Sequence, residues 1–139
     1  MAEAKTYIGI DVGVHTGYAV WNGSERRFEE IRTVGICEAM DAVIRRFNAG
    51  QDIRVVFEDA RQRRWFGTKG RESLQGAGSI KRESAIWEDF LAFHNIPFEM
   101  RGPKAGMTKW DARYFAKVTG WQGRTSEHAR DAALLVYQR

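Results

Sequence analysis

Apolar and polar residues follow one another along the chain in runs that predict a mixed α/β fold. Short apolar runs bounded by turn signals predict five strands, at residues 5–12, 18–21, 27–32, 53–57 and 96–100. Apolar residues at helical spacing predict four helices, at residues 37–47, 79–94, 108–118 and 126–137. This order, an antiparallel meander followed by a helix and a strand, predicts an α/β fold in which helices pack on a mixed sheet.

Turn and cap residues mark several ends of these elements. Asn22-Gly23 is a strong hairpin signal because both residues tolerate a positive φ. The strand at 27–32 is more polar than the others, and Pro97 opens the last strand, so both strands are expected at or near sheet edges. Thr108 and Ser126 are the expected N-caps of the last two helices, and the first of these helices should stop near Gly120.

Residues 59–78 interrupt the pattern of strands and helices. The segment is too polar to pack and too long for a simple connection, so it is predicted to be a functional loop. Glycines at positions 67, 70, 76 and 78 loosen its backbone, and its basic and aromatic side chains are Arg61, Arg63, Arg64, Trp65, Phe66, Lys69 and Arg71. Basic groups bind phosphates and aromatic rings stack on bases, which indicates contact with DNA rather than a merely solvated loop. Lys81 and Arg82 extend the same basic patch.

Composition limits the class of protein. A chain of 139 residues fits one domain, residues 1–139, and its net charge of +4 favours an anionic partner. No apolar run approaches the length of a membrane span, and the short charged N-terminus does not look like a signal peptide. A lone cysteine, Cys37, excludes an internal disulfide and agrees with a reducing cytoplasm. We therefore expect a cytoplasmic protein without a membrane partner.

The candidate chemistry comes from acids carried by apolar elements. Asp11 lies inside the first strand, where an unpaired charge is costly, and Glu58 ends another apolar strand. Glu127, His128 and Asp131 open the last helix and can share one of its faces. Hard cations such as Mg²⁺ bind carboxylate oxygens, and two such ions can activate a water and stabilise the leaving oxygen of a phosphodiester. The three segments therefore predict a metal site for phosphodiester hydrolysis.

Each of these residues also has an interpretation that involves neither catalysis nor metal binding. Asp11 can be a turn residue before Gly13, and His128 a surface histidine near a helix start. Glu127 suits the N-terminal end of a helix through the helix dipole better than it suits metal binding. Asp59 is expected beside the metal ligands or in solvent, so whether Glu127 or Asp59 contributes stays open.

The ordered set of motifs resembles RuvC-type Holliday junction resolvases, within the ribonuclease H-like superfamily. The motifs are Ile8-Gly9-Ile10-Asp11-Val12-Gly13, Gly17-Tyr18-Ala19, Val56-Phe57-Glu58 and His128-Ala129-Arg130-Asp131-Ala132-Ala133. The resemblance implies a ribonuclease H-like fold, with a five-stranded mixed sheet (an antiparallel meander plus parallel strands) flanked by helices. It also implies a homodimer and Mg²⁺- or Mn²⁺-dependent paired nicking of four-way DNA junctions. It also implies that Asp11, Glu58, His128 and Asp131 are the catalytic metal ligands, with Lys104 and Lys109 as basic active-site candidates.

The chain departs from the family in three respects. Many members carry an acid where this chain has His128, typical bacterial members are longer, and the arginine-rich segment 59–78 would fit a phage-type member. Two other classes of protein stay open. One is a YqgF-type nuclease that acts on RNA, and the other is a non-catalytic nucleotide-binding module, because both also begin with a strand that ends in Asp-x-Gly.

Overall fold

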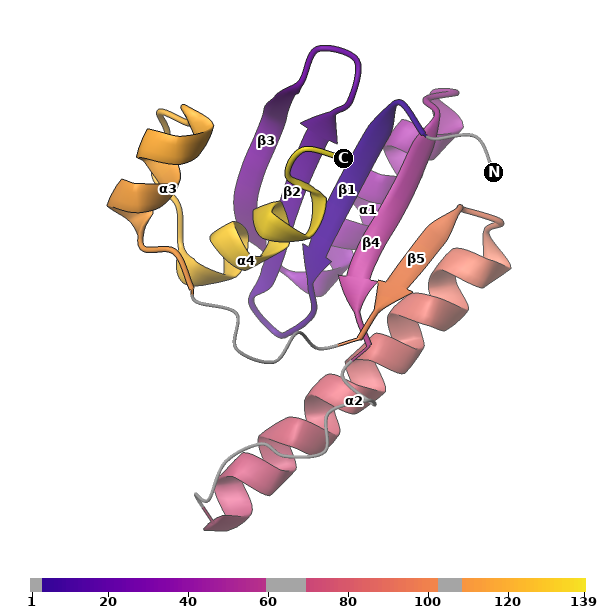
Figure 1. Cartoon of the computed structure of the whole chain (residues 1–139). Coiled ribbons are helices and arrows are strands. Elements are labelled where there is room, and N and C mark those ends of the chain that lie inside the picture. Colours follow the sequence, from indigo (N-terminus) through magenta and orange to yellow (C-terminus); the bar gives the residue numbers. More distant parts are fainter. Residues whose placement is uncertain (1–3, 60–69, 103–108) are drawn as a thin grey trace.

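The computed structural model describes residues 4–59, 70–102 and 109–139, and within these residues it forms one five-stranded sheet (Figure 1). Its strands are β1 (Thr6–Asp11), β2 (Thr16–Asn22), β3 (Arg27–Val34), β4 (Ile53–Glu58) and β5 (Phe98–Arg101). They lie side by side in the order β3-β2-β1-β4-β5. β1, β2 and β3 pair antiparallel, whereas β4 runs parallel to β1 and β5 parallel to β4. This is a ribonuclease H-like topology, and it confirms the predicted fold class.

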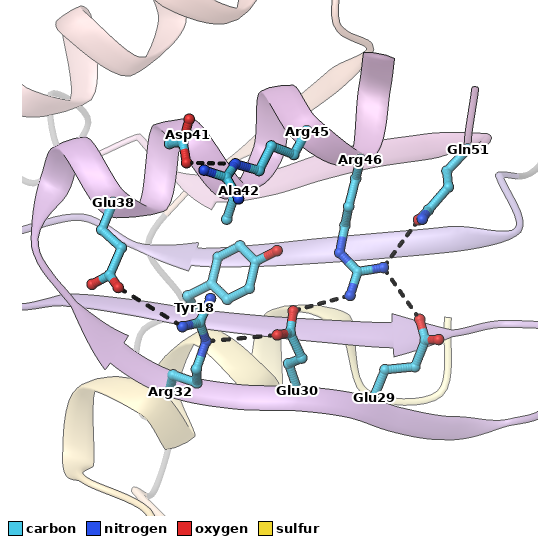
Figure 2. A pocket seen from close by; sticks show the side chains of 10 residues that line it. All are labelled: Tyr18, Glu29, Glu30, Arg32, Glu38, Asp41, Ala42, Arg45, Arg46 and Gln51. Carbon is cyan, nitrogen blue, oxygen red and sulfur yellow. Dashed lines mark hydrogen bonds and ion pairs between the residues drawn. The ribbon is translucent and has the colours of Figure 1, made fainter. Parts of the chain in front are cut away.

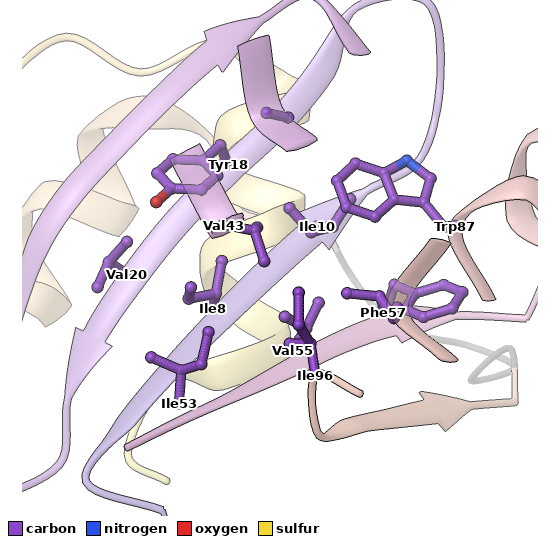
Figure 3. Close-up of a cluster of buried hydrophobic side chains, with 12 residues drawn as sticks. Ile8, Ile10, Tyr18, Val20, Val43, Ile53, Val55, Phe57, Trp87 and Ile96 are labelled. Carbon is purple, nitrogen blue, oxygen red and sulfur yellow. The ribbon is translucent and has the colours of Figure 1, made fainter. Parts of the chain in front are cut away.

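Helices cover both faces of the sheet, as Figure 1 shows. They are α1 (Ile36–Asn48), α2 (Gly70–Phe93), α3 (Ala112–Thr119) and α4 (Glu127–Val136). α1 and α2 lie on one face, where Val43 and Trp87 pack against strand residues such as Ile8, Ile10 and Phe57 (Figure 3). α3 and α4 lie on the other face. Each face of β1 is therefore buried, which is why the strand is apolar on both sides.

Two glycines let α4 lie unusually close to the sheet. A Cβ atom added to Gly17 would lie 2.0 Å from the carbonyl oxygen of His128, and one on Gly9 would lie 2.1 Å from that of Ala132. Neither distance is possible for a real side chain, so glycine is required at both positions. Ala129 and Ala133, both buried on the facing side of α4, complete this close approach. The packing fixes α4 over the ends of β1 and β2.

The prediction of a loop over 59–78 is wrong from residue 70 onward, because α2 begins at Gly70 rather than at Ser79. Gly76 and Gly78 suggested irregular backbone, but a glycine inside a helix costs only about 1 kcal/mol relative to alanine. Good helix formers surround them in the sequence, and a helix of 24 residues absorbs this cost. Residues 60–69 of the predicted loop lie outside the described residues.

Two local predictions need correction. α3 begins at Ala112, not at Thr108, because the side chain of Asp111 caps it by accepting a hydrogen bond from the backbone N–H of Tyr114 at 2.8 Å. The hairpin predicted at Asn22-Gly23 is confirmed, but its turn is longer and spans residues 23–26, where the Asn22 side chain accepts hydrogen bonds from two backbone N–H groups. Within this turn the positive φ belongs to Arg26, at 59°, and not to Asn22-Gly23.

Most of the other ends are confirmed. Ser126 caps α4 by accepting a hydrogen bond from the N–H of Ala129, and Gly120 ends α3 in the left-handed conformation. β3 and β5 are the two edge strands, as their polarity and Pro97 indicated. No helix among the described residues is both long and apolar enough to cross a membrane.

Candidate active site at the carboxyl end of strand β1

Asp11 is the last residue of β1 and its carboxylate is largely buried. Its side chain is 29% exposed, and in the β1–β2 ladder it lies opposite Gly17, which has no side chain to cover it. Burial, together with the negative charge of Asp131 nearby, raises the pKa of Asp11 from 3.8 to about 6. The carboxylate therefore occupies a place that favours a neutralising partner.

His128 meets Asp11 from the first turn of α4. Nδ1 of the imidazole lies 2.9 Å from Oδ2 of Asp11, across 117 residues of sequence. A carboxylate oxygen accepts, so Nδ1 carries the hydrogen, and Nε2 is the nitrogen left to bind a cation or substrate. This hydrogen bond lowers the pKa of Asp11 and so opposes the effect of burial. His128 does lie at the surface near the start of α4, with its side chain 51% exposed, and there it is bonded to Asp11.

Asp131 lies one turn further along α4, and Lys109 approaches it from the segment before α3. Nζ of Lys109 lies 3.6 Å from Oδ2 of Asp131 and forms a close ion pair with Glu127. Burial raises the pKa of Asp131, and the ammonium of Lys109 acts in the opposite direction. Lys109 also lowers the pKa of Glu127, which lies at the exposed start of the helix. The ammonium group of Lys109 thus already balances the negative charge of Glu127 and Asp131.

Glu58 reaches the same end of the sheet from the neighbouring strand. Ile10 and Phe57 are partners in the parallel ladder of β1 and β4, and Asp11 and Glu58 are the next residue of each strand. Side chains alternate between faces along a strand, so both acids project toward the face that α4 covers. Asp59, the following residue, is buried, so the part of the prediction that placed it in solvent is wrong.

The carboxylate oxygens of this site are ligands of the type that a hard divalent cation prefers, but their spacing in the structure does not enclose a cation. Asp11 and Asp131 interact directly through their charges, and oxygen donors of this kind are what Mg²⁺ and Mn²⁺ prefer. Among the residues that the structure describes, no three His, Cys, Asp or Glu side chains are close enough to form a metal site. His128 and Lys109 currently satisfy the two acids, so a cation would have to replace part of these contacts.

The predicted DNA-binding residues divide into two groups. Lys81 and Arg82 lie within α2, and Lys109 lies beside the acids of α4. The helix also includes Arg71. The remaining candidates are outside the described residues, namely Arg61, Arg63, Arg64, Trp65, Phe66, Lys69 and Lys104.

One residue near the site was not identified from the sequence. His15, in the turn between β1 and β2, has its ring centroid 6.3 Å from that of His128. The sequence could have indicated His15 by its position four residues after Asp11, because the short connection that contains it must begin at the end of the strand that carries Asp11.

A second surface feature lies on the opposite face of the sheet, between β3 and α1 (Figure 2). It is an open groove of about 680 Å³ with charged walls, and its arginines have acidic partners. Arg46 contacts Glu30 at 2.9 Å, and Arg45 contacts Asp41 at 2.8 Å. These charges are paired with one another, and the contact of Arg46 with Glu30 joins the edge strand β3 to α1.

Comparison with known proteins does not extend this picture. No protein-family model and no curated protein sequence matches the chain.

Proposed function

We propose that the protein is a divalent-metal-dependent endonuclease that resolves four-way DNA junctions by paired nicking of phosphodiester bonds. The observation that carries the proposal is the meeting of Asp11 with His128 and Asp131, from two different elements, at the carboxyl end of the central strand β1. Glu58 ends the adjacent strand on the same face. Acids placed in this way in a ribonuclease H-like sheet support phosphodiester hydrolysis, and the ordered motifs support junction resolution in particular.

Each side chain of the site would have a separate role in binding the metal ions or the substrate. Asp11, Glu58 and Asp131 would supply oxygen ligands, and Nε2 of His128 would be available as a nitrogen ligand. Through Nδ1, His128 also holds the carboxylate of Asp11 in a fixed orientation. Mg²⁺ or Mn²⁺, two ions per site, would lower the pKa of an attacking water and stabilise the leaving oxygen. Lys109, once released from Asp131, would be placed to bind a phosphate oxygen.

DNA rather than a small substrate is supported by charge and position. The chain carries a net charge of +4, and the basic segment with Arg61, Arg63 and Arg64 follows Glu58 almost directly in the sequence. Each such group that neutralises a phosphate adds salt-dependent affinity for nucleic acid. The lone cysteine, Cys37, is free and exposed, and agrees with the proposed cytoplasmic location.

A homodimer forms the second part of the proposal, because a four-way junction needs two nicks related by symmetry. On the outer face of α2, Ile86 and Phe93 are 55% and 79% exposed, seven residues apart. Arg82 and Asp89 alternate with them on the same face, so two antiparallel copies of α2 could pair these opposite charges. Sedimentation should give a dimer for the wild type and a monomer for Ile86→Glu. Val118→Glu, an exposed position on α3, is the matched control that should remain dimeric.

One experiment tests the activity. The purified protein with Mg²⁺ is offered a four-way junction, a linear duplex of the same sequence, and a structured RNA, with Asp11→Asn as the control for contaminating nucleases. The proposal expects symmetric nicks in the junction alone, and none with Asp11→Asn. Cleavage of RNA in preference to the junction would support the YqgF-type alternative, and absence of cleavage of all three would refute an enzyme of this kind.

A further inference from the structure

His15 lies at the rim of the candidate active site with its imidazole open to solvent. It is exposed, and it makes no hydrogen bond or ion pair to any other residue that the structure describes. Among the described residues, its ring faces that of His128, which is tilted by 33° at a centroid distance of 6.3 Å. His128 is engaged by Asp11, and Lys109 by Glu127 and Asp131. His15 therefore differs from both in having its ring nitrogens uncommitted within the described structure.

The backbone of His15 is held in place although the side chain is exposed. The turn begins at Asp11 and ends at Thr16, which is buried and opens β2. The hydroxyl of Thr16 donates to the carbonyl oxygen of Gly13 at 2.8 Å and so closes the turn. His15 is thus fixed between the acid of β1 and a buried residue. Val14 beside it is 67% exposed, so no described part of the protein covers this side of the site.

A phosphodiester that enters this site meets an excess of acids. Asp11, Glu127 and Asp131 all carry or can carry negative charge there, so the substrate needs hydrogen-bond donors as well as cations. A neutral imidazole has one N–H and a protonated one has two, so His15 can donate in either state. We propose that His15 is a substrate-contact residue whose N–H donates to a non-bridging oxygen of the phosphodiester bound at this site. The inference rests on the proposed function and adds a residue to it.

The test replaces the donor in two ways. His15→Phe keeps a flat ring beside His128 but has no N–H, whereas His15→Gln keeps a side-chain N–H donor. A hydrogen bond to a charged group contributes enough that its loss should lower kcat/KM for junction cleavage about tenfold or more in His15→Phe. His15→Gln should stay within about threefold of the wild type. Because the residue is exposed, both variants should melt at the wild-type temperature.

Binding gives a readout that does not depend on cleavage. In the Asp11→Asn background, His15→Phe should weaken affinity for the junction, and His15→Gln should restore it. If the wild type cleaves the junction and His15→Phe matches it in both kcat/KM and affinity, this inference fails alone. Equal losses in His15→Phe and His15→Gln would also overturn it, because the N–H would then not be what matters. A wild type that cleaves no substrate refutes the proposed function instead, which keeps the two failures distinguishable.

Discussion

Replacing Gly17 with alanine should damage the candidate active site although none of its functional side chains is replaced. The added Cβ would lie 2.0 Å from the carbonyl oxygen of His128 and 2.9 Å from the Cβ of Asp11. Real Cβ contacts start at about 3.0 Å, so α4 and β2 must separate by roughly 1 Å at this point. The displacement falls on the residue that hydrogen-bonds Asp11 and on the helix that carries Asp131.

The magnitude follows from that distance. A misplacement of about 1 Å at a reacting centre can lower the rate about 10²-fold, and a forced increase in core volume destabilises a protein by about 1–3 kcal/mol. We therefore expect Gly17→Ala to reduce kcat for junction cleavage by about two orders of magnitude and to lower the free energy of unfolding by about 1–3 kcal/mol. Affinity for Mn²⁺, measured by calorimetry, should fall as well, because the helix that carries His128 and Asp131 moves away from Asp11.

The control is Gly35→Ala, at the N-cap of α1. Its backbone is extended, with φ at −74°, and an added Cβ meets nothing within 4 Å. This variant should keep full activity and change the free energy of unfolding by less than about 1 kcal/mol, because alanine restricts the unfolded chain but is a poorer N-cap than glycine. A folded Gly17→Ala protein with wild-type cleavage and Mn²⁺ affinity would refute the reasoning, because α4 would then tolerate the shift without moving the site.

Three further predictions use the same assays. In metal-free buffer, ionisation of the buried Asp11 carboxylate should lower the free energy of unfolding by up to about 3 kcal/mol as the pH rises from 3.8 through about 6. The stability gain of Asp11→Asn over the wild type should therefore grow across that range. Parallel plots of unfolding free energy against pH for the two proteins would contradict this. His128→Ala removes a hydrogen bond that lowers the pKa of Asp11, so the acid limb of kcat/KM should move to higher pH, and an unmoved limb would exclude this role. Replacing Arg61, Arg63 and Arg64 with serine should make the slope of log K for DNA binding against log salt concentration shallower by about 0.9 for each phosphate that is no longer neutralised. An unchanged slope would mean that the segment does not contact DNA.

The local sequence was sufficient for most of the fold because the strongest signals are local. The apolar runs around Ile8 and Val56 define central strands, and a polar β3 with its charges predicts an edge. The same local reasoning failed for α2, where glycines at 76 and 78 were given more weight than the helix formers around them. It also misplaced the start of α3, because Thr108 and Asp111 are both acceptable caps and only the packing of the chain chooses between them.

The contacts within the site could not be predicted, because they join residues far apart in the chain. Acids at the ends of apolar strands indicated Asp11 and Glu58, but nothing local indicated that His128 would bond to Asp11 through Nδ1. Lys109 came from the resemblance alone, and its ion pair with Glu127 depends on how the segment before α3 crosses the start of α4. His15 was missed because a lone histidine in a turn has no pattern around it.

The close approach of α4 explains why the site can exist in a stable protein. Burial raises the pKa of both Asp11 and Asp131, and the charge of Asp131 adds to the increase at Asp11, so ionisation of the two acids opposes folding. The opposing free energy must come from packing, and glycines at positions 9 and 17 allow a whole helix to pack against the strands that carry the first acid. If the proposed function holds, Asp11→Asn should therefore raise stability and abolish cleavage in the same protein, since the buried carboxylate that opposes folding is also the proposed ligand of the divalent cation.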